Sequence, residues 1–228
     1  MAVSPQNPDP DDGIPDVERL LTLSDGVVAI ALTLLVLQLT VPAIEGVSSS
    51  QAHSPKYLWD ELTANGWDQL ISYVVSFYVI AQFWLTHHRL FRSIKGHLEG
   101  LAWWNFAFLF TITLMPFSSD LLGRFGRNAV AIDLFALNIL LASLTLQGVV
   151  LFARRHGLES EPPEAFDQRS GLFRSLWIYF ILILTAALAW PLPGLAAFGW
   201  LLLLPSQSVG ARLARRYPRS PRSPVSTA

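Results

Sequence analysis

The feature that most constrains this chain is a series of apolar runs, each about as long as a lipid bilayer is thick. Six runs qualify or nearly qualify, at residues 19–41, 67–90, 98–122, 129–153, 172–191 and 194–211. A bilayer core of roughly 30 Å takes about 20 apolar residues in a helix. Because the runs are continuous, and because lipid cannot satisfy an open sheet edge, we expect helices rather than strands. The sequence therefore predicts an all-α membrane protein with six transmembrane helices.

Composition agrees with a membrane location and narrows the chemistry. Charged residues make up 14% of the 228 residues, whereas soluble domains carry about 25%. The net charge of −1 gives no basic surplus for nucleic acid, and the absence of cysteine excludes disulfides and thiolate catalysis. The histidines lack the helical spacing of a metal pair, and there is no nucleophile motif or phosphate loop. We expect neither an enzyme nor a bound cofactor or metal.

The basic residues predict the orientation of the helices, because Lys and Arg gather on the cytoplasmic side of membrane proteins. With the N-terminus inside, all of the 16 basic residues except Lys56, Arg124 and Arg127 fall on the cytoplasmic side. Both termini are therefore expected in the cytoplasm. The chain divides into an acidic, proline-rich disordered tail (1–16), a six-helix membrane domain (17–211) and a basic tail rich in proline and serine (212–228). Residues 42–66 should form an extracytoplasmic loop, and 154–171 a cytoplasmic one.

The first run, RLLTLSDGVVAIALTLLVLQL (19–39), has two different sides when it is wound as a helix of about 100° per residue. One stripe carries Ile30, Thr33, Leu34 and Leu37. Ser24 and Asp25 point away from that stripe, close to the cytoplasmic end. The stripe alone does not distinguish a functional surface from a lipid-facing one. Asp25 is more informative, because an ionisable residue inside a span normally faces the bundle interior and has a partner.

Partners for Asp25 lie at the same depth on the next two predicted helices. Helix 67–90 ends in QFWLTHHRLF, with Trp84, His87 and His88, and helix 98–122 begins with EGLAWWNFAF, with Asn105. A carboxylate accepts strong charge-assisted hydrogen bonds from an indole, an imidazole or an amide. His87 and His88 point about 100° apart on a helix, so spacing leaves open which of them pairs with Asp25.

A proline stands inside the third run, at residue 116. Because proline has no N–H and its ring clashes with the preceding turn, it kinks a helix and frees a backbone carbonyl. We expect Ser118 or a neighbouring helix to satisfy that carbonyl.

The first run resembles the R-x-x-x-F-S-D motif and following helix of the transmembrane protein 175 family, the endolysosomal potassium channels and their bacterial homologues. The resemblance extends to FWLTHHRLF in the second run and to NFAFLFTITLMPFSSDLLGRF in the third. Leu23 stands where the motif has phenylalanine, whereas Arg19, Ser24 and Asp25 match it. The last three runs match the family in hydropathy alone.

The resemblance implies a homotetramer of six-helix subunits in the cell membrane of a prokaryote, with four copies of the first helix lining a central pore. It implies passive potassium conduction with modest selectivity over sodium, through a filter of apolar side chains. On this chain the filter positions are Ile30, Leu34 and Leu37, with Thr33 alongside. Arg19, Ser24 and Asp25 would tie the first helix to its neighbours in a structural or gating network with His87, His88 and Asn105.

The residues themselves leave two other functions open. A proton-coupled carrier or proton pathway would use Asp25 with His87 or His88 as relay groups. A non-transporting membrane scaffold would use none of them. Unitary potassium currents in a planar bilayer would indicate the channel, saturable flux the carrier, and no flux the scaffold.

Overall fold

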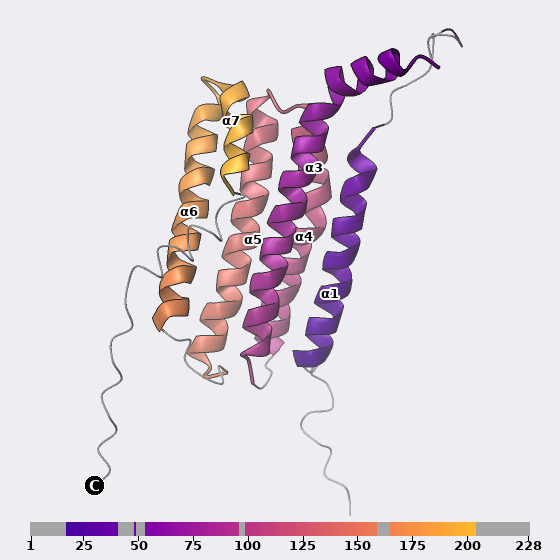
Figure 1. The fold of residues 1–228 in the computed structure, drawn as a ribbon. Helices are drawn as coiled ribbons and strands as arrows, with labels where there is room; N and C mark the ends of the chain where they lie inside the picture. Colours follow the sequence, from indigo (N-terminus) through magenta and orange to yellow (C-terminus); the bar gives the residue numbers. More distant parts are fainter. Residues whose placement is uncertain (1–16, 41–47, 49–52, 96–98, 159–164, 204–228) are drawn as a thin grey trace, which may run out of the picture.

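The computed structural model describes residues 17–40, 48, 53–95, 99–158 and 165–203, and throughout these ranges the regular structure is helical. The elements are α1 (Val17–Leu34), η1 (Leu35–Gln38), α3 (Pro55–Arg92), α4 (Glu99–Arg124), α5 (Ala129–Arg155), α6 (Ala165–Ala189), α7 (Pro193–Gly199) and η2 (Trp200–Leu203). The long helices α1, α3, α4, α5 and α6 run side by side, and the short α7 turns back beside α6 (Figure 1).

Four helical segments are long and apolar enough to cross a membrane: Val17–Gln38, Gly66–Arg92, Glu99–Arg124 and Ala129–Arg155. The prediction of an all-α membrane protein is confirmed. The fifth and sixth spans stay predictions, because the apolar part of α6 identified among the described residues is the shorter Leu176–Ala189. The run at 194–211 is not one continuous α-helix, since α7 ends at Gly199 and passes into η2, and 204–211 lie outside the described residues.

Two predicted loop boundaries are wrong. The helix expected at 67–90 begins at Pro55, inside the predicted loop 42–66, and α6 begins at Ala165, inside the predicted loop 154–171. Pro55 occupies the first turn of α3, where its fixed φ favours a helix start and its missing N–H costs nothing. Hydropathy overlooked this extension because Lys56, Asp60 and Glu61 dilute its apolar residues. In Figure 1 this first part of α3 bends away from the axis of the bundle.

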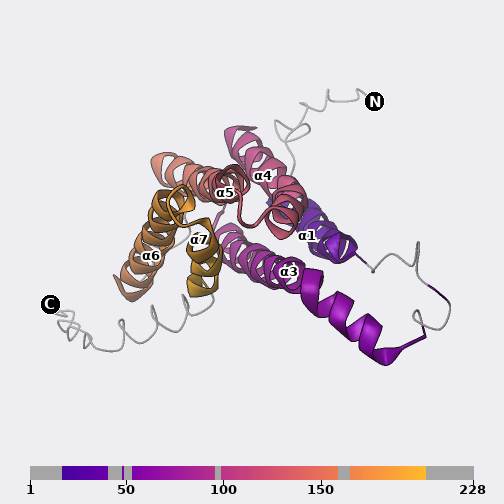
Figure 2. The same ribbon diagram turned by 90° about the horizontal axis from the view of Figure 1, so that it is seen from above.

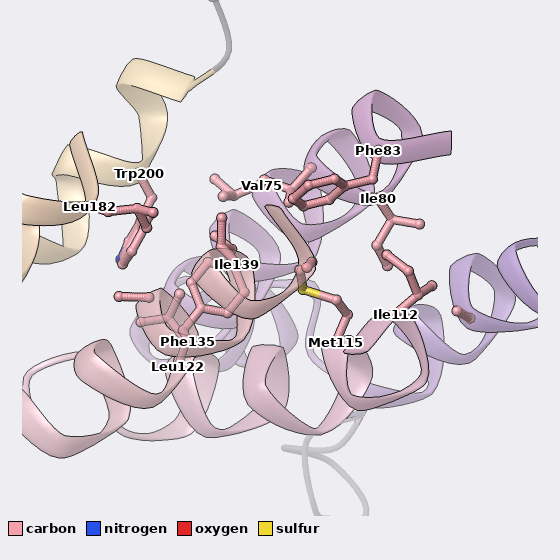
Figure 3. Packing of buried hydrophobic residues seen from close by; sticks show 14 of the residues in the cluster. Val75, Ile80, Phe83, Ile112, Met115, Leu122, Phe135, Ile139, Leu182 and Trp200 are labelled. Carbon is pink, nitrogen blue, oxygen red and sulfur yellow. The ribbon is translucent and has the colours of Figure 1, made fainter. Parts of the chain in front are cut away.

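The core lies where α3, α4 and α5 meet, and α6 and η2 extend it on one side. Figure 3 shows 14 of its side chains and labels Val75, Ile80, Phe83, Ile112, Met115, Leu122, Phe135, Ile139, Leu182 and Trp200. Small residues let the helices approach closely, as is usual in membranes. A methyl group added at Gly123 of α4 would lie 3.2 Å from the Cα of Gln69 on α3.

Helix α1 lies at the edge of the bundle, against α3 and α4 (Figure 2). Its buried residues recur at intervals of three and four, which is the spacing of one face of a helix. They are Leu20, Ser24, Val28 and Ala31, followed by Leu35 and Gln38 in η1. Among the described residues, the opposite face of α1 is exposed, so it is available for another role.

Candidate functional site

The free face of α1 carries the four residues of the predicted stripe. The side chains of Ile30, Leu34 and Leu37 are 61%, 44% and 74% exposed in the isolated subunit. Thr33 is also exposed, and its hydroxyl donates to the carbonyl oxygen of Ile30 at 2.8 Å. With that proton used inside the helix, the face presents hydrocarbon and a hydroxyl oxygen that can still accept a hydrogen bond.

The buried face of α1 carries Ser24, which begins a chain of hydrogen bonds across three helices. The Ser24 hydroxyl donates to the Leu20 carbonyl oxygen at 2.7 Å, and it accepts from Asn105 Nδ2 of α4 at 3.0 Å. Asn105 Oδ1 in turn lies 2.7 Å from His87 Nε2 of α3. An amide oxygen can only accept, so in this chain His87 carries its proton on Nε2 and donates it to Asn105. Ser24, Asn105 and His87 are each fully buried.

The imidazole of His87 is held between two phenyl rings. Its centroid lies 4.2 Å from that of Phe91 and 5.0 Å from that of Phe108, with interplanar angles of 25° and 9°. The second ring nitrogen, Nδ1, is buried and has no hydrogen-bond partner among the described residues. Stacking and one hydrogen bond therefore fix both the plane and the direction of this ring.

Asp25 belongs to a different contact from His87. The indole Nε1 of Trp84 donates to Asp25 Oδ1 at 2.7 Å. His88 Nδ1 lies 3.9 Å from the same oxygen, and the His88 ring leans against the Trp84 indole with centroids 5.3 Å apart. The histidine beside Asp25 is thus His88, whereas His87 pairs with Asn105.

Arg19 is the one predicted network residue that stands apart. Its side chain is exposed near the start of α1, and the structure records no hydrogen bond or ion pair between it and another described residue. Its membership of the network stays a prediction. The roles assigned to Ser24, Asp25 and the two histidines also stay predictions, although their side chains do connect α1 to α3 and α4.

A second polar cluster surrounds Pro116 of α4, at the end of the bundle where α1 finishes. Ser118 Oγ donates to the Met115 carbonyl at 3.1 Å, which is not the Ile112 carbonyl that the missing N–H of Pro116 frees, so the prediction for that carbonyl stays a prediction. From α3, Ser72 Oγ donates to the Ser119 carbonyl at 2.6 Å, and Ser76 Oγ donates to Ser119 Oγ at 2.8 Å. We did not single out these α3 serines from the sequence, although polar residues inside an apolar run are a usable signal.

Asn138 of α5 completes the cluster around the proline kink. With its amide turned so that both of its ends are satisfied, its nitrogen donates to the Thr111 carbonyl at 3.1 Å. Its oxygen then accepts from the Met115 N–H at 3.2 Å and lies 3.1 Å from Ser118 Oγ, whose one proton goes either to this oxygen or to the Met115 carbonyl. Thr111 and Met115 stand four residues apart, the spacing of one backbone hydrogen bond in an α-helix. The Asn138 amide therefore bridges the two ends of that bond just before Pro116.

A bundle of long apolar helices, joined at their crossings by buried polar contacts, defines a multi-pass membrane protein. Residues 19–116 match the family model described as "Endosomal/lysosomal potassium channel TMEM175". The chain belongs to this family of ion channels, as the motif on the first helix predicted.

Several known proteins are similar to this chain. A potassium channel of Chryseobacterium sp. (strain P1-3) is 29% identical over 74% of this chain and 81% of its own. A potassium channel of Streptomyces collinus is 31% identical over 63% and 68%. An endosomal/lysosomal proton channel TMEM175 of Danio rerio is 26% identical over 60% of this chain and 25% of its own.

The fold is also that of a solved structure. The crystal structure of a lysosomal potassium-selective channel TMEM175 homolog from Chamaesiphon minutus superposes with a TM-score of 0.66. The match covers 87% of this chain and 97% of that one, at 24% identity. The bundle described above is therefore the fold of this family.

Proposed function

We propose that this protein is a potassium-permeable channel, built as a homotetramer in which the free face of α1 lines a central pore. The observation that carries the proposal is the division of α1 into two faces. Its polar Ser24 is buried against α4, while its apolar Ile30, Leu34 and Leu37 face away from the subunit. Relatives named potassium channels support the permeant ion.

Assembly follows from the same geometry. One helix cannot enclose a pore, and symmetric copies arranged around an axis are the usual solution for identical subunits. Each subunit would contribute six membrane helices, with α6 and the segment from Pro193 onward completing the bundle. We place both termini in the cytoplasm of a prokaryotic cell and the subunits in its plasma membrane, because the basic residues concentrate at the ends of the helices that face that side.

Rings of Ile30, Leu34 and Leu37 would select ions by restricting the pore rather than by coordinating them. Branched hydrocarbon offers no oxygen to replace an ion's hydration shell, so these rings set a dewetting barrier. An ion crosses at least partly hydrated, and the larger potassium ion loses water at lower cost than sodium. The accepting oxygen of Thr33 beside the rings lowers that cost locally. This mechanism predicts modest selectivity.

The contacts behind α1 would hold the pore-lining face in place. Ser24, through Asn105 and His87, joins α1 to α4 and α3, while Asp25 joins it to α3 through Trp84 and His88. These groups face away from the proposed pore. We expect their removal to change assembly or gating more than ion selectivity, and Asp25→Ala is the simplest variant that checks this.

Purified protein in a planar bilayer tests the proposal. We expect unitary currents that reverse close to the potassium equilibrium potential under a potassium gradient. Leu37→Asn should raise sodium permeability or conductance by wetting the constriction. Val36→Asn is the matched control, because Val36 is also exposed on the same turn but lies off the stripe. If Leu37→Asn changes nothing, or if Val36→Asn changes as much, the pore is not on this face.

A proton pathway is the second candidate, favoured by the Asp25 carboxylate beside His88 and by the proton-channel name of the zebrafish relative. Of the two adjacent histidines, His88 lies beside Asp25, with His88 Nδ1 3.9 Å from Oδ1, whereas His87 is bonded to Asn105. A proton gradient without potassium separates the two candidates. Proton flux that is lost in both Asp25→Asn and His88→Gln, with potassium current intact, would establish the relay.

A further inference from the structure

The last turn of the first helix departs from α-helical geometry. Residues Leu35–Gln38 form a 3₁₀-helix directly after α1, and Leu39 then becomes extended with φ −73° and ψ 104°. The stretch LVLQ holds no glycine or proline that would impose this change. Because 3₁₀ turns are frequent at the C-terminal ends of α-helices, what holds this one in place has to be found in its contacts.

One such contact comes from Gln38, whose side chain is 9% exposed. Its Nε2 donates to the carbonyl oxygen of Pro116 on α4 at 2.6 Å. A short hydrogen bond from a neutral amide, buried between two helices, fixes the end of η1 against one point of α4. A second contact holds the chain beyond it, where the Thr40 N–H and hydroxyl both donate to Gln69 Oε1 of α3, at 3.2 and 2.8 Å.

The acceptor is itself held by the rest of the bundle. Around Pro116, α4 receives Ser72 and Ser76 from α3 and the Asn138 amide from α5. Two helices, α3 and α5, therefore bond to the segment of α4 whose backbone the proline interrupts. Gln38 anchors η1 to a part of α4 that both of these helices also hold.

The geometry of η1 decides where Leu37 lies. A 3₁₀-helix turns about 120° and rises about 2.0 Å per residue, against about 100° and 1.5 Å for an α-helix. Over the three steps from Leu34 to Leu37, the 3₁₀ form puts Leu37 directly in line with Leu34. An α-helix would rotate it by roughly 60° and draw it back by about 1.5 Å. The pattern of burial agrees with this repeat of three residues. Leu34 and Leu37 are both exposed, while Leu35 and Gln38 are both buried.

We propose that Gln38 is a positioning residue of the ion pathway, which sets Leu37 at the outer entrance of the pore by anchoring the 3₁₀ turn to the Pro116 carbonyl. The inference rests on the proposed function for its consequence, because Leu37 matters to ions only if α1 lines the pore. The anchoring of η1 by Gln38 concerns geometry alone. It can therefore be tested both by cysteine modification, which needs no current, and by ion permeability.

The chain contains no cysteine, so single-cysteine reporters have no background. We would introduce Leu37→Cys or Leu34→Cys, reconstitute the protein in liposomes, and measure the rate of modification by a thiosulfonate reagent using mass spectrometry. Gln38→Met then removes the amide at similar side-chain size. Ser76→Ala is the matched control, because it removes a buried hydrogen bond to the same part of α4 without touching α1.

We expect Gln38→Met to speed modification of the cysteine at position 37 about fivefold, the population change that the loss of one net hydrogen bond produces. The rate at position 34, inside α1, should stay within about twofold. In the cysteine-free protein, Gln38→Met should lower the potassium-to-sodium permeability ratio, and Ser76→Ala should leave it unchanged. An unchanged rate at position 37, or an equal rise in Ser76→Ala, overturns the anchor.

The two proposals fail differently. If the wild-type protein carries no current but Gln38→Met still changes position 37 selectively, the proposed function is wrong while the anchor stands. If the wild type conducts and the modification rate at position 37 does not change in Gln38→Met, the proposed channel stands and the anchor is wrong. Should Gln38→Met fail to assemble, Gln38→Asn retains an amide that is one methylene too short, and the same shift is expected from it.

Discussion

Replacing Asn105 by leucine removes the centre of the hydrogen-bond chain behind α1. Leucine is close to asparagine in size, so the change creates little cavity. It leaves two buried groups without partners: the Nε2–H of His87 and the accepting side of the Ser24 hydroxyl. His87 Nδ1 already has no partner among the described residues, so both nitrogens of a fully buried ring would then be unsatisfied.

Two contributions set the expected loss in the free energy of unfolding caused by Asn105→Leu. Two interhelical hydrogen bonds in a membrane protein average about 0.6 kcal/mol each. Leaving a buried donor unsatisfied costs about 1–3 kcal/mol. The stacking of His87 on Phe91 and Phe108 survives the substitution and limits rearrangement. We therefore expect Asn105→Leu to lower the free energy of unfolding by about 1–3 kcal/mol.

Titrating a denaturing detergent into mixed micelles unfolds the protein and measures this loss in the free energy of unfolding. Thr113→Val is the control on the same helix, because its hydroxyl is exposed and bonded within α4, and it should change stability by less than about 0.5 kcal/mol. Ser24→Ala combined with Asn105→Leu should cost less than the sum of the single changes, since both remove the same contact. Wild-type stability in Asn105→Leu, or full additivity of the pair, would refute a coupled chain.

Three further predictions address other parts of the molecule. Ile30→Asn should raise sodium permeability measured from reversal potentials, because it wets the middle of the proposed constriction. Trp84→Phe should weaken the link of Asp25 to α3 and shift channel open probability without altering the permeability ratio, since the indole donor at 2.7 Å is lost while the ring remains. Gly148→Leu should reduce the yield of folded protein on size-exclusion chromatography, because even a methyl group there would overlap the Trp104 ring.

Much of the first helix could be predicted because its signals are local. Helical angle alone separates Ile30 and Leu37 from Ser24 and Asp25, and the structure exposes the first pair and turns the second toward neighbouring helices. A carboxylate inside an apolar run also required a partner nearby. The indole of Trp84 supplies it.

The remaining features depend on contacts between distant segments. Two adjacent histidines differ by about 100° in direction, and only the packing of α1 against α3 decides that His88 meets Asp25. The extension of α3 back to Pro55 escaped detection because hydropathy measures lipid affinity and not helix formation. The 3₁₀ turn at Leu35–Gln38 contains no glycine or proline that would have marked it, and the residue that Gln38 contacts lies far along the chain, on α4.

Polar anchors hold α1 near both of its ends and leave its middle to apolar packing. Ser24 holds the first part of the helix through Asn105. Gln38, at the end of η1, holds the other end through the Pro116 carbonyl. Between them the buried face offers Val28, Ala31 and Leu35, which contribute no directional contacts. Apolar side chains tolerate sliding and rotation far better than hydrogen bonds do, because dispersion has no preferred direction. If the free face of α1 lines a pore, as we propose, a change in pore width that keeps both anchors would therefore occur by bending or rotation near Ile30, midway between them.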